Sequence, residues 1–257
     1  MELVADAAGR AGSRPAEKPV AQDHGEFILL SSGRKGTFLA LSALESHPQV
    51  RTYEQVLEMP TYRPEDSGRE VLEHLFGSPP DGIRATVLPV AWSSARNRYS
   101  GFWDDLRARG VSLIYLQRRN MLRWYVSMFL AAETGVWIAS VPPQSAPPPV
   151  QVDPAYCRKR ILLDRLEQRQ AKRFFAGHRT LDLWYEDLIY DFDQQMEKVQ
   201  HFLGVAPHRL RPSCVKQQTR PLAQAIANYE QLKAVWSGTR WEAYLDDCAE
   251  PGVSVGP

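Results

Sequence analysis

A glycine-containing turn with two adjacent cations follows the first apolar run of the sequence. The segment Ser31-Ser32-Gly33-Arg34-Lys35-Gly36 comes after Phe27 to Leu30 and before Thr37 to Ser46, whose apolar residues have nearly helical spacing. A helix N-terminus, a turn that brings the backbone close to a ligand, and positive side chains together favour a bound anion. We therefore expect this junction to hold a phosphate-like group.

A second basic cluster, Gln117-Arg118-Arg119-Asn120, follows the apolar run at 111–116. Arg119 and Ser127 are eight residues apart, about two helical turns, so they converge on one anion only if Arg119 precedes the helix and folds back. The alternative is that these arginines are solvated at a strand end. Two basic junctions in one chain favour a ligand with two separated anionic groups.

The turn differs from the phosphate loop of kinases and NTPases. That loop reads G-x-x-x-x-G-K-[ST], whereas Gly33 and Gly36 are three apart and both cations precede the second glycine. No acidic residue follows 111–116 to hold magnesium. The pattern predicts a smaller anion, bound without a metal.

Composition narrows the possible partners. The 257 residues carry a net charge of +1, which gives no overall attraction to nucleic acid or membranes. The three cysteines have neither disulfide-framework nor zinc spacing. No run approaches the roughly 20 apolar residues of a membrane span, and the N-terminus has no apolar signal core. We expect a cytoplasmic protein with a polar tail at 1–25, a single domain at 26–250 and a flexible end at 251–257.

Strand-like and helix-like segments alternate along the chain, which predicts an α/β fold with a mostly parallel central sheet. The expected strands are 27–31, 85–91, 111–116 and 181–185. The expected helices are 37–46, 68–76, 102–109, a helix from about 120, 155–175, 192–202 and a long final helix over 221–236. The proline-rich stretch 141–154 is an extended loop, either a lid or substrate wall or a passive connector.

The ordered motifs resemble the sulfotransferase family that uses 3′-phosphoadenosine 5′-phosphosulfate (PAPS). Arg34-x-Gly36-Thr37, with the following helix to His47-Pro48, resembles the family's 5′-phosphosulfate loop. Arg119 with Ser127 matches its 3′-phosphate pair. The block Tyr185 to Leu188 and the segment from Lys216 resemble its downstream motifs. The resemblance covers about residues 27–247 and implies a three-layer α/β/α fold like that of P-loop NTPases.

The resemblance also implies roles for individual residues. Arg34 stabilises the leaving phosphate, and Arg119 and Ser127 hold the 3′-phosphate of the donor. The other residues implied at the donor site are Lys35, Gly36, Thr37, Phe38, Tyr185, Lys216, Gln217, Thr219 and Arg220. Tyr185 is equally explained as a core residue, and Arg220 as a charge near the following helix.

The donor loop departs from the family pattern at two positions. Lys35 stands where Ser is usual and Phe38 where a second Thr is usual, which removes one hydroxyl contact worth about 1–2 kcal/mol. Lys35 adds charge, so either Arg34 or Lys35 could reach the leaving group, and position favours Arg34.

The acceptor hydroxyl needs a general base. Members of the family that act on protein tyrosine or carbohydrates carry a glutamate shortly after the first helix, and Glu54 lies at the matching place. A surface role for this carboxylate is the alternative.

The sequence thus predicts a metal-free sulfotransferase acting on a small-molecule hydroxyl, of a carbohydrate or specialised metabolite by analogy. Two other functions stay open: a non-catalytic nucleotide-binding descendant of the family and an ATP-dependent small-molecule kinase. The sequence also leaves a homodimer open.

Overall fold

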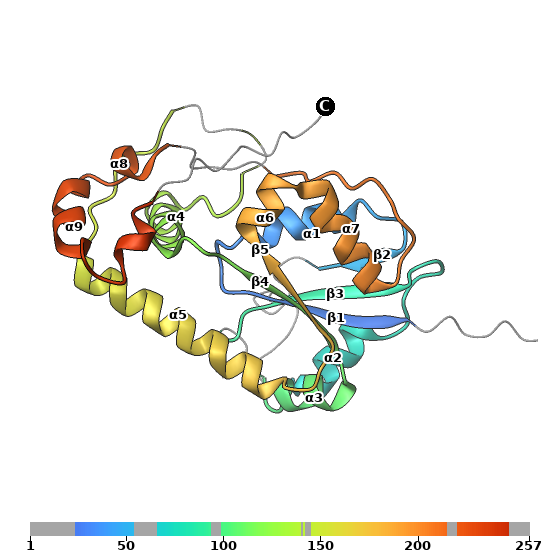
Figure 1. The fold of residues 1–257 in the computed structure, drawn as a ribbon. Helices are drawn as coiled ribbons and strands as arrows, with labels where there is room; N and C mark the ends of the chain where they lie inside the picture. Colours follow the sequence, from blue (N-terminus) through green and yellow to red (C-terminus); the bar gives the residue numbers. More distant parts are fainter. Residues whose placement is uncertain are drawn as a thin grey trace, which may run out of the picture.

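The computed structural model describes residues 24–53, 66–93, 99–139, 141, 145–214 and 220–246. Their centre is a five-stranded sheet with the strand order β2-β3-β1-β4-β5, in which every neighbouring pair is parallel (Figure 1). The strands are β1 (Gly25–Leu30), β2 (Val50–Thr52), β3 (Ala85–Val90), β4 (Ser112–Gln117) and β5 (Thr180–Trp184). The predicted α/β class with a parallel sheet is confirmed.

Helices cover both faces of this sheet (Figure 1). One face packs against α1 (Thr37–Glu45), α6 (Tyr185–Tyr190) and α7 (Phe192–Leu203). The other packs against α2 (Gly68–Phe76), α3 (Phe102–Arg109) and the C-terminal end of α5 (Pro154–Phe174). Alternate residues of β1 supply the two cores, with Phe27 and Leu29 in the first and Ile28 and Leu30 in the second. This arrangement is the predicted three-layer fold.

A third cluster of buried residues lies beside the sheet. It joins α4 (Met121–Thr134) to the C-terminal helices α8 (Leu222–Ala225), α9 (Tyr229–Trp236) and η2 (Glu242–Tyr244). Trp236 is fully buried within it. This cluster fixes α4, which carries part of the candidate site.

The predicted continuous helix over 221–236 is wrong, because the chain leaves the helical conformation between α8 and α9. Ile226 is extended and forms a parallel bridge with Val150. The Asn228 side chain accepts from the N–H of Val152 at 2.9 Å and donates to its C=O at 2.8 Å. Hydrogen bonds with Val150, at the end of the proline-rich stretch, satisfy the C=O of Ala225 and the N–H of Ala227 at this break.

Local signals explain where the helices begin. Ser67 and Glu70 form a capping box at α2, Asn120 caps α4, and Asp153 before Pro154 starts α5. No helix within the described ranges is long and apolar enough to span a bilayer.

The parallel sheet brings three functional segments to one edge. The turn 31–36 follows β1, Arg118 follows β4, and Tyr185 follows β5. The chain proceeds to β2 and β3 on one side of β1 and to β4 and β5 on the other, which makes the β1/β4 junction the switch point where such sheets bind ligands.

Candidate donor and acceptor site

The N-terminus of α1 is open to a ligand. Its N-cap residue is Gly36, at φ 94°, with no side-chain cap and no acidic residue in the first turn. A Cβ at this position would lie 2.6 Å from Cδ2 of Tyr185, so the aromatic ring packs directly against the glycine. The first N–H groups of a helix have no partner within the helix. They are therefore free to bind an anion that reaches this turn.

Neighbouring elements hold the turn by its carbonyl groups. Trp124 Nε1 on α4 donates to the carbonyl of Gly33 at 2.9 Å. Arg118 Nη1 donates to the carbonyl of Arg34 at 3.2 Å. The guanidinium of Arg118 lies 4.4 Å from the Tyr185 ring centroid. Two carbonyl oxygens of the turn are thus bonded to side chains of α4 and of the segment after β4.

Arg34 and Ser127, 93 positions apart, are in direct contact. Arg34 Nε donates to Ser127 Oγ at 2.9 Å, and its Nη1 donates to the Trp137 carbonyl. Burial, and then the nearby charge of Arg118, lower the pKa of Arg34. Such surroundings favour a negative ligand, because an anion would offset both the lost hydration and the repulsion between the two arginines.

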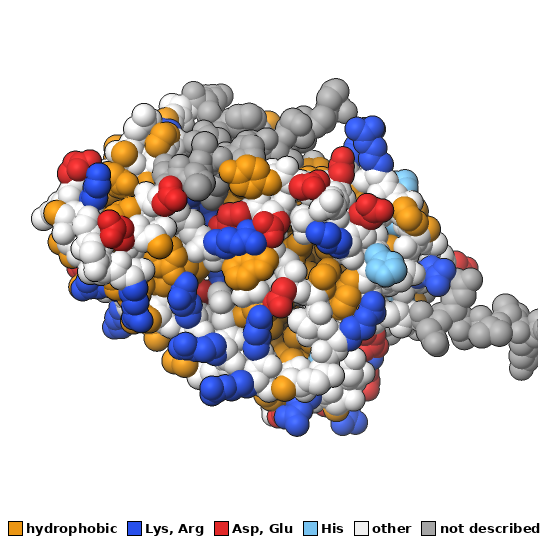
Figure 2. Space-filling view, viewed as in Figure 1, with side chains coloured by type: hydrophobic (Ala, Val, Ile, Leu, Met, Phe, Trp, Pro, Cys, Tyr) orange, Lys and Arg blue, Asp and Glu red, His pale blue; other side chains and the backbone are white. Residues whose placement is uncertain are grey.

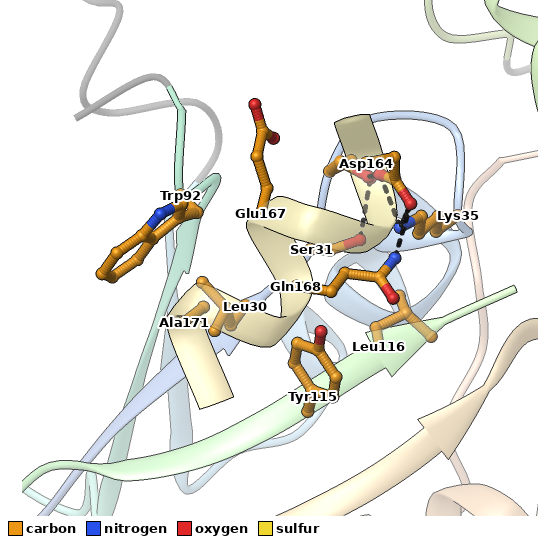
Figure 3. A pocket seen from close by; sticks show the side chains of 11 residues that line it. Leu30, Ser31, Lys35, Trp92, Tyr115, Leu116, Asp164, Glu167, Gln168 and Ala171 are labelled. Carbon is orange, nitrogen blue, oxygen red and sulfur yellow. Dashed lines mark hydrogen bonds and ion pairs between the residues drawn. The ribbon is translucent and has the colours of Figure 1, made fainter. Parts of the chain in front are cut away.

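Lys35 contacts a different helix from Arg34 and is fully buried. Its Nζ lies 2.9 and 2.8 Å from the two carboxylate oxygens of Asp164 on α5. Asp164 also accepts from Ser32 Oγ. It accepts from Gln168 Nε2 as well, at 2.6 Å (Figure 3). Burial lowers the pKa of Lys35, against the opposing effect of Asp164. The ammonium group of Lys35, at the position where the family usually has serine, therefore contacts α5.

A cavity of about 20 Å³, room for about one water molecule, adjoins this ion pair. Tyr115 and Trp92 line it (Figure 3). Within the described region, Tyr115 Oη and Trp92 Nε1 are buried without a hydrogen-bond partner. The cavity therefore offers two polar groups to a small polar molecule.

Glu167 also lines this cavity and points away from the Asp164 cluster (Figure 3). Burial, followed by the charge of Asp164, raises the pKa of Glu167. Sequence reasoning missed this carboxylate. Its spacing of three from Asp164 on an amphipathic helix is the signal that could have found it.

Arg119 has other partners than the predicted ones. Its guanidinium donates to both oxygens of Asp187 at 2.6 and 2.8 Å and lies 4.8 Å from the Trp184 ring centroid. The hydrogen bonds with Asp187 raise the pKa of Arg119 and lower that of the carboxylate. The structure thus joins Ser127 to Arg34, and Arg119 to α6.

The remaining predicted residues divide into two groups. Thr37 and Phe38 are partly buried in the first turn of α1, Tyr185 is buried, and Arg220 donates to the Pro147 carbonyl of the proline-rich stretch. Four predicted residues lie outside the described ranges: Glu54, Lys216, Gln217 and Thr219.

Comparisons with known proteins extend these observations. No family model matches this chain. The chain is 27% identical to Nodulation protein H of Rhizobium tropici over 240 residues, which cover 88% of this chain and 95% of that protein. A Nodulation protein H of Rhizobium meliloti (strain 1021) is 28% identical over 234 residues, covering 86% and 94%. A sulfotransferase structure from Alicyclobacillus acidocaldarius covers 88% of this chain and 96% of its own, with 15% identity and a TM-score of 0.47.

The predicted resemblance to the sulfotransferases is confirmed. The two relatives match most of the chain, 88% and 86% of it.

Proposed function

We propose that this chain is a sulfotransferase that transfers a sulfuryl group from PAPS to an acceptor hydroxyl. One observation carries the proposal: the uncapped N-terminus of α1, with Arg34 in contact with Ser127 beside it. The helix N-terminus and Arg34 suit the 5′ end of the donor, because a helix N-terminus and a guanidinium both bind phosphate oxygens.

We assign the 3′-phosphate to Ser127 and Arg119. Arg119 must exchange Asp187 for the phosphate, and this exchange costs little. Both side chains of the ion pair are about half exposed, at 48% and 40%, and such pairs contribute about 0–1 kcal/mol. Arg118, in contrast, is 8% exposed and bonded to the turn, so we assign it to holding Arg34 in place.

Bound PAPS supplies an activated sulfuryl group, which the acceptor oxygen attacks at sulfur while the sulfur–oxygen bond to the 5′-phosphate breaks. Arg34 then faces the oxygen on which negative charge develops, where a fixed cation lowers the barrier. Gly36 lets the Arg34 turn approach this oxygen closely, and the first amides of α1 hold the group in line.

The proton of the acceptor hydroxyl requires a carboxylate, and two are candidates. Glu54 is the residue that the family resemblance implies. Glu167 lines the cavity beside the turn, and burial raises its pKa above the ordinary carboxylate value. Comparing Glu54→Gln with Glu167→Gln assigns the role, because loss of the base lowers kcat by about 10²- to 10⁴-fold.

Lys35 has a supporting role in this proposal. Its charge is neutralised by Asp164, so the lysine fixes the turn to α5 and leaves donor contact to Arg34. Phe38, in place of a hydroxyl, removes one donor contact.

The test is the thermal stability of the full chain with adenosine 3′,5′-bisphosphate, with 5′-AMP and with Mg-ATP. A ligand at a hundred times its Kd stabilises the folded state by about 2.7 kcal/mol. We expect this shift with the bisphosphate and a smaller one with 5′-AMP. Arg34→Ala should weaken both ligands, whereas Arg119→Ala should weaken only the bisphosphate.

Arg109→Ala is the matched control. Arg109 forms an arginine–carboxylate pair with Glu26, at a distance of 2.6 Å, and this pair does not involve the turn. It should leave the bisphosphate shift unchanged. A shift with Mg-ATP alone would favour the kinase, and bisphosphate binding without sulfuryl transfer to any carbohydrate or metabolite hydroxyl would favour the non-catalytic descendant. No shift with any ligand would refute the donor site.

A further inference from the structure

The outward side of α5 combines leucines with basic residues. Leu162, Leu163 and Leu166 are 42%, 41% and 44% exposed. They share a shallow surface depression with Arg158, Lys159 and Arg169, at helical spacings of three and four. The leucines lie in the middle of this strip and the cations at its two ends. We call these six residues the α5 strip.

Helix α5 carries many more positive than negative side chains. The helix reads PAYCRKRILLDRLEQRQAKRF, with seven lysines and arginines, one aspartate and one glutamate. Asp164 is buried against Lys35, and Glu167 lines the cavity. Figure 2 shows basic side chains following the line of α5 along the lower left of the view. Because the whole chain has a net charge of only +1, this positive surface is local.

The shape of the α5 strip narrows the choice of partner. Every residue that lines the depression belongs to one helix, so no second element forms a wall that could grip a peptide. Two copies of the chain joined at this strip would bring like charges together, which opposes association. A broad, negatively charged and partly apolar surface fits the strip best.

We propose that the α5 strip docks on an anionic lipid membrane. The helix lies along the surface, with its leucines at the boundary between headgroups and acyl chains and its cations among the headgroups. α5 is about 31 Å long at 1.5 Å per residue, long enough to contact several lipids at once. Each cation near such a surface strengthens binding about fivefold, and salt weakens it.

The test is flotation of the full chain with vesicles of phosphatidylcholine alone and of phosphatidylcholine with about a third phosphatidylserine. We expect binding to the anionic vesicles only, and its loss at high salt. The double variant Arg158→Glu with Lys159→Glu should bind at least tenfold more weakly. Leu162→Ser with Leu166→Ser should also weaken binding at constant charge.

Arg69→Glu with Arg209→Glu is the matched control, because both arginines are exposed, lie outside α5 and give the same change in net charge. It should bind vesicles within about twofold of the unmodified chain. Circular dichroism of each variant checks that it folds.

Two results would overturn the proposal. The first is failure to bind anionic vesicles at low salt. If the chain then binds a soluble acidic amphipathic peptide instead, the partner of the strip is a protein. The second is an equal loss in the Arg69/Arg209 control, which would show that net charge alone governs binding.

Discussion

Replacing Asp164 with Asn keeps the size of the side chain but removes the charge that neutralises Lys35. The two side chains are only 3% and 1% exposed, so the lysine ammonium would remain buried without a counter-ion. Removing one partner of a buried ion pair costs about 3–5 kcal/mol. For a chain of this size, each kcal/mol lowers the Tm by about 2–4 °C. Asp164→Asn should therefore lower the Tm by roughly 6 to 20 °C.

The double variant Lys35→Met with Asp164→Asn separates the ion pair from the rest of the site. An Asn at 164 still accepts from Ser32, and a Met at 35 fills a similar volume without charge. We expect the double variant to be more stable than Asp164→Asn alone, because no uncompensated charge is left in the core. Urea unfolding of all four proteins gives the coupling energy, expected to be about 2 kcal/mol or more.

The chain contains a matched control for this experiment. Lys172 and Asp182 form the same type of pair at 2.9 Å, with side chains 47% and 50% exposed. Asp182→Asn should cost less than about 1 kcal/mol, because water already screens that pair. If Asp164→Asn costs no more than this control, or the double variant shows no recovery, the buried pair does not fix the turn as we argue.

Further results are expected at three sites. Gly36→Ala should cost about 1–3 kcal/mol in urea unfolding, since its φ is 94° and the new Cβ would meet the ring of Tyr185; a variant as stable as the original would contradict this contact. Burial raises the pKa of Cys157 to about 12, so thiol reagents at pH 8 should reach it only after unfolding. Because the unfolded thiol ionises first, this residue should also lower the free energy of unfolding by up to about 1.4 kcal/mol per pH unit between about pH 9 and 12, a slope that Cys157→Ala should lack. Asp187 has a lowered pKa, so its pair with Arg119 stabilises the fold above the ordinary carboxylate pKa and loses this effect as the pH falls through the lowered value. The free energy of unfolding of Arg119→Ala should therefore differ from that of the original chain by less than about 1 kcal/mol at neutral pH, and by nothing in strong acid.

Local sequence signals predicted most of the elements. The expected helices at 68–76 and 102–109 match α2 and α3 residue for residue, because a capping serine starts the first and Gly110 ends the second. The short strand β2 was not predicted. Its three residues are too few for a pattern and depend on pairing with β3.

The site was predictable where it depends on neighbouring residues and less so where it depends on distant ones. Gly36 and the start of α1 follow from a local motif. The partner of Lys35 does not, since Asp164 is 129 positions away and one of many carboxylates in the chain. The break at Ile226 was missed for the same reason, because a distant segment supplies the bridge to Val150.

The hydrogen bonds of the Asn120 side chain affect the order in which parts of the structure form during synthesis. Its Oδ1 caps α4, and its Nδ2 donates to the carbonyls of Tyr244 and Asp246, at 3.2 and 3.0 Å. Synthesis delivers the N-terminal segments of a chain first. The sheet can therefore form early, but α4, which carries Ser127, gains its last fixed contacts only after residue 246 has emerged. A nascent chain halted before that point would lack the Asn120 bonds that tie α4 to the C-terminal end.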